Sequence, residues 1–204
     1  TATGIQYGES HDVTGVWCGE EVTPAEAVVL AVPWRAAARL VPEVLPPVDD
    51  SFVGSPITAV HLWFDRQIVD LPHAVLVGRV SQWVFRGGEE HVQKHEELSS
   101  EAKSEKAYHC QVVISASRGL CDGNREQLLE TVVSELREIF PDAQTARLIR
   151  SRVVTDPTAV LSVRPGIDTV RPAAVTPIRN LFLAGDWTQT GWPSTMEEIG
   201  RAHV

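Results

Sequence analysis

The sequence predicts a fold that mixes helices and strands, in the α/β or α+β class, and three observations support this. Several apolar runs have the length of a strand, the clearest being residues 27–32 and 55–65. Residues 124–140 carry apolar side chains at the 3.6-residue spacing of an amphipathic helix. Glycines and prolines separate these segments, so a chain of 204 residues should form one large or two small domains.

Composition excludes several classes of function. Eighteen basic against 27 acidic residues give a net charge of −9, which argues against nucleic acid as a partner, because such binding needs clustered lysine and arginine. The three cysteines show no C-x-x-C spacing, so a metal site and a disulfide scaffold are both unsupported. No apolar run approaches the ~18 residues that span a bilayer. We therefore expect a cytoplasmic protein without nucleic acid or metal, and leave open its oligomeric state and a peripheral contact at the inner face of the membrane.

The first fifty residues predict short strands and one short helix. Glycines punctuate residues 1–19, and Val13–Cys18 is the clearest strand of the expected meander. Residues 27–32 form a continuous apolar run, which is typical of a buried strand, and a proline ends it. The alanine-rich segment Trp34–Leu40 predicts a helix. Residues 42–50 are rich in proline and mark an expected domain boundary.

The middle of the chain predicts a mostly antiparallel sheet and one long helix. Residues 55–65 alternate with largely apolar side chains on both faces, so we expect both faces of that strand to be covered. Further strands are expected within residues 73–85, 110–117 and 145–157. The helix over residues 124–140 has Asp122 or Asn124 available as its N-cap.

The polar segment between these strands, residues 89–106, predicts a solvated, mobile connection. His91 and His95 are four residues apart, so a helix would bring them to one face. Because no third ligand is in view, two surface histidines are the better interpretation, and no metal site is expected.

The most informative stretch is residues 180–198, NLFLAGDWTQTGWPSTMEE. A short apolar strand stops at Gly185, and Asp186 follows at its carboxyl end, where open α/β sheets bind ligands. A carboxylate there can accept two hydrogen bonds from a sugar-like diol. The Gly-Trp-Pro turn exposes backbone N–H groups, and Ser194 or Thr195 can cap a following helix, whose N-terminus stabilises a phosphate or a reduced flavin. From the chemistry alone, an ordinary capped strand-turn-helix connection explains the same residues.

That stretch resembles the C-terminal flavin signature of the amine-oxidase and phytoene-desaturase-like flavoproteins. Three other segments resemble the same superfamily: AEAVVLAVPWRAAARLVPE, SPITAVHLWFDRQIVDLP and QVVISASR. The last two are most similar to the branch called hydroxysqualene dehydroxylase. The resemblance covers nearly the whole chain and implies an FAD cofactor. The cofactor-binding residues that it implies are Gly185, Asp186, Trp187, Gly191, Trp192, Pro193, Ser194, Thr195 and Met196.

The resemblance also implies that this chain is the C-terminal part of a two-domain enzyme. Residues 1–45 and 166–197 would belong to the FAD-binding domain and its mixed sheet, and residues 46–165 to a substrate-binding domain with an antiparallel sheet. The G-x-G-x-x-G turn of the N-terminal Rossmann βαβ unit does not occur in this sequence. Residues 198–204, EIGRAHV, match one reading frame of a common sequencing adapter, and our hypothesis is that they are an artefact.

The implied function is reduction of hydroxysqualene to squalene by an FAD-dependent oxidoreductase of isoprenoid and hopanoid biosynthesis, with a long apolar isoprenoid as substrate. A carotenoid or phytoene desaturase, or another amine-oxidase-like flavoenzyme, is the alternative within the fold, and a cofactor-free binding module is the alternative outside it. Residues 57–64 and 83–85 would line the substrate pocket. No catalytic residue is assigned, although His61 and Arg79 are the first to test. The chain by itself is expected to be inactive.

Overall fold

The computed structural model describes residues 1–45, 52–93, 104–121 and 124–194. Its contacts divide the chain into two units, one made of Thr1–Gly54 with Leu161–Val204 and the other of Ser55–Val160. Both units contain strands and helices, which confirms the mixed class, and each has its own hydrophobic core. The assignment of one part of the chain to FAD and another to substrate stays a prediction.

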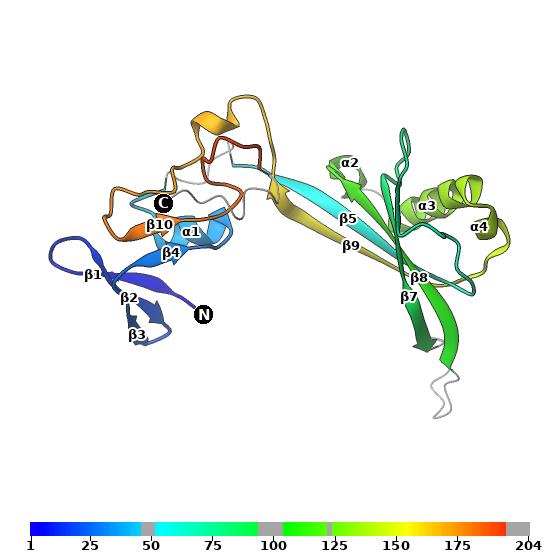
Figure 1. Cartoon of the computed structure of the whole chain (residues 1–204), viewed down its shortest axis with the longest axis horizontal. Coiled ribbons are helices and arrows are strands. Elements are labelled where there is room, and N and C mark those ends of the chain that lie inside the picture. The colour runs from blue at the N-terminus through cyan, green and yellow to red at the C-terminus, as the bar shows by residue number, and fades with distance from the viewer. Residues whose placement is uncertain (46–51, 94–103, 122–123, 195–204) are drawn as a thin grey trace. The chain divides into compact units, whose positions relative to one another are not determined.

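Two small sheets and a helix build the first unit (Figure 1). An antiparallel meander is formed by β1 (Gly4–Tyr7), β2 (Val13–Cys18) and β3 (Glu21–Pro24), as the glycine pattern predicts. Near the other end of the chain, β10 (Leu181–Leu183) pairs in parallel with β4 (Val28–Leu30), so two strands far apart in sequence lie side by side. The helix α1 covers Trp34–Leu40, the residues that the sequence predicts, and a short 3₁₀ helix covers Ile167–Thr169.

The β4–β10 pair is anchored in the core of this unit. Leu181 and Leu183 are almost wholly buried, and they share the core with Ala37 of α1, with Val41, which follows it, and with Trp187 from the loop beyond β10. Each large apolar side chain buried in this way stabilises the fold by roughly 1.5–3 kcal/mol. The end of β10 is therefore a firmly held point from which the following loop departs.

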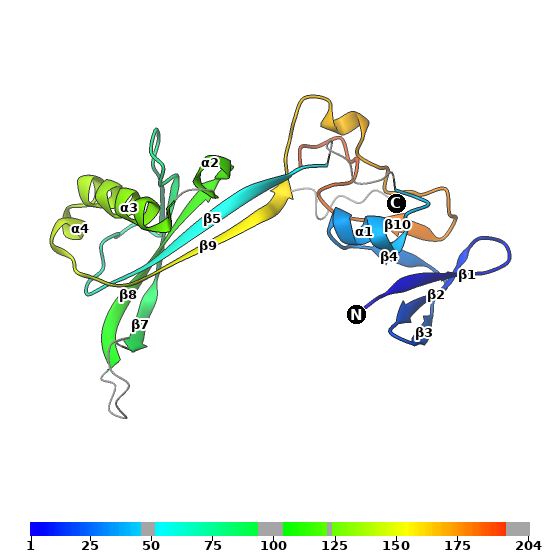
Figure 2. The ribbon, with the colours of Figure 1, turned by 180° about the vertical axis from the view of Figure 1, so that it is seen from behind.

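A five-stranded sheet with helices on one side builds the second unit. Its strands, in the spatial order β6-β7-β8-β5-β9, are β5 (Gly54–Phe64), β6 (His73–Val75), β7 (Trp83–Gln93), β8 (Ser104–Ser115) and β9 (Leu148–Leu161). The helices are α2 (Arg118–Cys121), α3 (Arg125–Ile139) and α4 (Pro141–Thr145). The β6–β7, β7–β8 and β8–β5 pairs are antiparallel, as expected from strands joined by short turns. Figure 2 shows the same elements from behind, with α3 and α4 again beside the sheet.

The predicted amphipathic helix is confirmed. The Asn124 side chain accepts a hydrogen bond of 2.9 Å from the Glu126 amide, which satisfies one of the free N–H groups at the start of α3. The apolar stripe of α3 packs on one face of the sheet. The buried residues that meet there include Leu128, Val132 and Leu136 from the helix and Val60, Leu62, Phe64, Val112 and Ile114 from the strands.

The expectation that both faces of β5 are covered is confirmed only in part. Thr58, Val60 and Leu62 are buried on the helix side, whereas on the opposite side Trp63 is buried but Ala59 and His61 are half-buried. The alternation of β5 therefore reports two different environments, because successive side chains point to opposite faces of a sheet.

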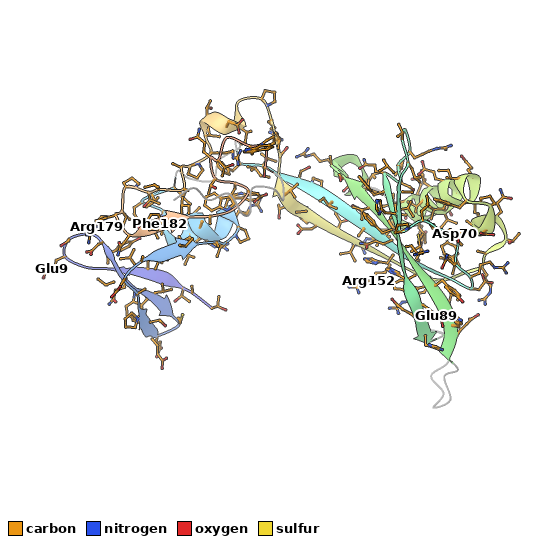
Figure 3. All side chains as sticks on the ribbon, in the orientation of Figure 1. Glu9, Asp70, Glu89, Arg152, Arg179 and Phe182 are labelled. Carbon is orange, nitrogen blue, oxygen red and sulfur yellow. The ribbon has the colours of Figure 1, made fainter. Side chains whose placement is uncertain are left out.

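The expectation of a solvated, mobile connection over residues 89–106 is wrong for the residues that the structure describes there, 89–93 and 104–106. β7 continues to Gln93 and β8 begins at Ser104, so the two strands form a long hairpin. Glu89, labelled in Figure 3, forms a 3.0 Å ion pair with Lys106 of the opposite strand. His91 lies opposite Lys106 in this ladder, which excludes the helix that would have brought His91 and His95 together; His95 itself is outside the described residues. Hydrogen bonds between β7 and β8 hold this polar segment in an extended conformation. In an antiparallel pair these bonds satisfy the N–H and C=O groups of alternate residues, whatever the polarity of the side chains.

Among the described residues, no helix is both long enough and apolar enough to cross a lipid bilayer.

Candidate functional site

The strand β10 delivers an acidic residue to the carboxyl end of the parallel strand pair. The ladder with β4 is extended by a 3.0 Å hydrogen bond from the Ala184 amide to the Leu30 carbonyl, after which the chain turns at Gly185 and continues with Asp186. The carboxyl ends of parallel strands are the usual ligand-binding edge of such sheets. Figure 3 labels Phe182 on β10 and Arg179 in the turn before it, which locates this strand.

Gly185 is required by its neighbour and by its backbone. Its φ is +148°, a conformation that residues with a side chain rarely adopt, and an added Cβ would lie 2.5 Å from Nε1 of Trp187. That indole is 2% exposed and donates a 2.9 Å hydrogen bond to the Val32 carbonyl, just beyond β4. The Trp187 side chain is thus part of the core, so only its main-chain atoms can face a ligand.

One oxygen of the Asp186 carboxylate forms a hydrogen bond that closes the loop, and the other oxygen is open to a ligand. Its Oδ2 accepts a 2.9 Å hydrogen bond from the Ser194 hydroxyl, which ties the two ends of the loop together. Within the part of the chain that the structure describes, Oδ1 has no hydrogen-bond partner. Asp186 is half-buried. A carboxylate in this state can accept further hydrogen bonds from a ligand hydroxyl.

A buried arginine, which the sequence analysis missed, holds the same loop. The Arg171 side chain is 1% exposed, and its guanidinium donates to the carbonyls of Asp186 at 3.0 Å and Trp192 at 2.6 Å. It also pairs with Asp168 at 3.0 Å. Arginine suits this task because its planar fork can reach several acceptors at fixed angles. No local pattern in the sequence indicates this role, because the acceptors are main-chain carbonyls 15 and 21 residues away.

The Gly-Trp-Pro turn is exposed, as the sequence predicts. Gly191 has a φ of +82° with open space where a Cβ would stand, and Trp192 is 48% exposed. The Trp192 amide donates a long 3.4 Å hydrogen bond to the Thr190 hydroxyl. Thr195, Met196 and the helix expected after them lie outside the described residues.

The other residues singled out from the sequence do not join this loop. Arg79 pairs with Glu138 of α3 at 2.7 Å, and His61 pairs with His109 of β8 at 3.1 Å; all four belong to the second unit. Arg147 pairs with Glu105, and Arg150 lies over the Trp63 ring. Among the described residues, no group of three or more histidine, cysteine, aspartate or glutamate side chains is arranged to hold a metal ion.

The loop from Gly185 to Ser194 fits one end of a flavin cofactor. It offers an open carboxylate oxygen, which matches the hydroxyls of a ribityl chain, and an exposed turn beside it. The buried Arg171 cation is paired with Asp168 and also donates to the main-chain carbonyl of Asp186, which holds the loop in place.

Comparisons with known proteins support a flavin as the cofactor. The family model described as flavin containing amine oxidoreductase matches residues 2–198. Hydroxysqualene dehydroxylase of Sinorhizobium fredii is 31% identical over 178 residues, which cover 86% of this chain and 36% of that protein. 15-cis-phytoene desaturase of Synechococcus elongatus is 25% identical over 187 residues, which cover 87% of this chain and 38% of that protein. The chain thus spans well under half the length of these relatives.

Two solved structures share the fold at low identity. An oxidoreductase from Methanosarcina mazei aligns with a TM-score of 0.62 and 16% identity over 98% of this chain and 47% of that one. Cyclohexylamine oxidase from Brevibacterium oxydans aligns with a TM-score of 0.61 and 13% identity over 99% of this chain and 46% of that one. The match over residues 2–198 leaves no doubt about the grouping: the chain belongs to the flavin containing amine oxidoreductase family.

Proposed function

We propose that this chain is part of a longer FAD-dependent oxidoreductase that reduces hydroxysqualene to squalene. The observation that carries the flavin part of the proposal is the open carboxylate of Asp186, just beyond β10. Ser194 donates a hydrogen bond to this carboxylate, and Arg171 holds the main-chain carbonyl of Asp186. The direction of the reaction is supported by the relatives, since those named hydroxysqualene dehydroxylase share more identical residues with this chain than the phytoene desaturases do.

In this proposal the loop after β10 binds and orients the cofactor. The Asp186 carboxylate would accept hydrogen bonds from the ribityl hydroxyls, and the main chain of Gly191–Pro193, with Ser194, Thr195 and Met196, would lie near the ring system. FAD supplies the hydride for the reaction when it is bound. The chain's own contribution is to hold the cofactor in one orientation and to keep water away from it.

The apolar substrate is assigned to the second unit. Trp83 and Phe85 lie on the face of the sheet opposite α3, stacked at 5.9 Å between ring centroids and 38% and 37% exposed. Exposed aromatic rings that gather on one face usually mark a binding surface. We assign this face to the long isoprenoid chain of the substrate.

A peripheral membrane contact is part of the same proposal, because the substrate is insoluble in water. Leu71, Val75 and Val77 are 56%, 52% and 91% exposed, and they lie close together in sequence around β6. Such apolar side chains can insert into the boundary of a lipid layer. Replacing Val77 by Asp should weaken co-sedimentation of the complete protein with phospholipid vesicles, whereas unchanged co-sedimentation would contradict this part of the proposal.

The proposed reaction can be tested on a complete protein that contains this chain. We expect it to purify with a bound flavin and, when supplied with hydroxysqualene and a reductant, to produce squalene. A product with additional double bonds from phytoene would favour the alternative, a desaturase that uses the flavin as an oxidant. A colourless protein would instead favour a binding module without a cofactor.

A further inference from the structure

Two histidines form a hydrogen-bonded pair on the open face of the second unit's sheet. His61 on β5 and His109 on β8 lie with Nδ1 of His61 and Nε2 of His109 3.1 Å apart, and their rings stack at 5.3 Å with an angle of 13°. They belong to the same face as Trp83 and Phe85, because Phe85 lies opposite Gln111, which in turn lies opposite His61. The pair therefore adjoins the surface to which we assign the substrate.

The position of the pair is fixed by its neighbours. The His109 ring stands where a Cβ of Gly87 would be, so only glycine fits at that place, where the β7–β8 register shifts. On the other side, His109 packs on Trp63 at 4.9 Å between ring centroids. The Trp63 indole donates a 2.8 Å hydrogen bond to Glu90, and Arg150 of β9 lies over its ring. Two solvated surface histidines would not be packed against a glycine and a tryptophan in this way.

An imidazole pair of this kind can store and release one proton. In the neutral pair, one ring donates N–H and the other accepts, which leaves one outward N–H. In the singly charged pair there are three N–H groups, two of which point outward, and loss of the one on Nε2 of His61 returns the neutral, still hydrogen-bonded pair. Among the described residues, Nε2 of His61 has no hydrogen-bond partner, so it is available to a ligand.

The surroundings of the pair act on His109 in opposite directions. Burial lowers the pKa of His109, Glu90 partly offsets this, and His61 adds to the lowering. The groups nearby on the other strands are Glu90 of β7, the neutral Gln111 of β8, and Arg150 of β9, which lies over the Trp63 ring. The proton is therefore held less tightly than on an isolated histidine.

We propose that the His61–His109 pair donates the proton that converts the departing hydroxyl group of the isoprenoid alcohol into water, an inference that rests on the proposed function. The carbon–oxygen bond breaks, its electron pair leaves with oxygen, and the outward N–H of His61 supplies the proton. The carbon would then take up a hydride, the chemistry that reduced FAD would supply in the complete enzyme. Alcohol, hydride and proton thus give hydrocarbon and water, and the pair returns to its neutral form. The rings of Trp83 and Phe85 can stabilise the positive charge that develops on carbon.

The test compares two leaving groups in the complete enzyme. His61→Gln and His109→Gln should each lower the rate of squalene formation from hydroxysqualene by roughly 10²–10⁴-fold, the usual contribution of a general acid. With an ester of the same alcohol, whose carboxylate leaves without a proton, both variants should stay close to the unaltered enzyme. The matched control is His91→Gln, an exposed histidine on β7, which should leave both rates unchanged. Flavin content is measured for every variant to confirm folding.

A milder variant tests the pair without removing it. Glu90→Gln can still accept the Trp63 hydrogen bond but loses the negative charge that raises the pKa of His109. The rate with the alcohol requires the protonated pair, so it falls as pH rises through the pKa of His109, and in Glu90→Gln this fall should begin at lower pH. The ester should show no such limb in either enzyme.

The outcomes separate this inference from the proposed function. If the unaltered complete enzyme forms no squalene from the alcohol or from the ester, the proposed function fails. If it forms squalene but the histidine variants lose activity equally on both substrates, or on neither, the pair is not the acid. An unmoved pH limb in Glu90→Gln would overturn the inference as well.

Discussion

Gly185 and Trp187 lie so close that a Cβ atom on residue 185 would stand 2.5 Å from the indole Nε1. This nitrogen is already bound to the Val32 carbonyl, so the ring cannot retreat without losing a buried hydrogen bond. Together the two residues fix the direction in which the chain leaves β10.

Gly185→Ala should destabilise the fold by about 2–6 kcal/mol, since overpacking and a strained φ each cost about 1–3 kcal/mol. The control is Gly191→Ala, which shares the positive φ but has open space around the added methyl group, so it should cost only the backbone strain. Thermal unfolding of the complete protein measures both. An equal loss of stability in the two variants would show that the contact with Trp187 adds nothing to the cost of the Gly185→Ala substitution.

Arg171→Met should destabilise the loop after β10, because the carbonyls of Asp186 and Trp192 would lose their charged donor. Hydrogen bonds to charged groups contribute about 1.5–3 kcal/mol each. We expect a lower unfolding temperature together with weaker flavin retention. Arg179→Met is the control, since its ion pair with Asp12 is 85% exposed on the arginine side and should contribute little. If Arg171→Met behaves like the control, Arg171 does not organise the loop.

Much of this could be predicted from the sequence, and the exceptions have physical reasons. Trp34–Leu40 and the stripe of α3 depend on local composition and periodicity, so they are visible in sequence. The β7–β8 hairpin was missed because its ends are polar, and pairing across strands, not composition, holds them. Arg171 was missed because its acceptors are main-chain carbonyls of residues 15 and 21 positions away, which no local pattern records. The His61–His109 pair likewise depends on the register of two strands.

Glu135 should make stability depend on pH. Its carboxylate is nearly buried and accepts hydrogen bonds of 2.9 and 2.8 Å from the amides of Val80 and Ser81. Burial by itself raises its pKa, but the hydrogen bonds from Ser81 and Val80 and the charge of Arg79 outweigh it, so the pKa lies below its ordinary 4.5. A lowered pKa gives stability that is present above the unfolded pKa and is lost as pH falls through the folded pKa.

Glu135→Gln should therefore lower the free energy of unfolding at neutral pH by about 1–2 kcal/mol, the worth of its charged hydrogen bonds. The difference from the unaltered protein should shrink in acid below pH 4.5. Urea unfolding at several pH values measures this. Glu138→Gln, whose carboxylate is 53% exposed, is the control and should show a much smaller difference. A difference for Glu135→Gln that is independent of pH would contradict the assigned charge.

Cys110 and Cys18 should differ in reactivity towards alkylating reagents. Burial raises the pKa of the Cys110 thiol to about 12, so almost no thiolate forms near neutral pH, whereas Cys18 is exposed. Mass spectrometry after brief treatment with iodoacetamide should find Cys18 modified and Cys110 intact in the folded protein. In denaturant both should react at similar rates. Modification of Cys110 in the native protein would show that the α3 face of the sheet is less well packed than described.

The central claim is that the Asp186 carboxylate, just after β10, binds a flavin. The flavin retained by the Asp186→Ala variant tests this claim most directly. In a complete protein that contains this chain, the flavin content after purification and dialysis should fall sharply, while circular dichroism stays unchanged. Asp142→Ala, which removes an exposed carboxylate from α4, should keep its flavin. If Asp186→Ala retains as much flavin as the unaltered protein and the control, the assigned role of this loop is contradicted.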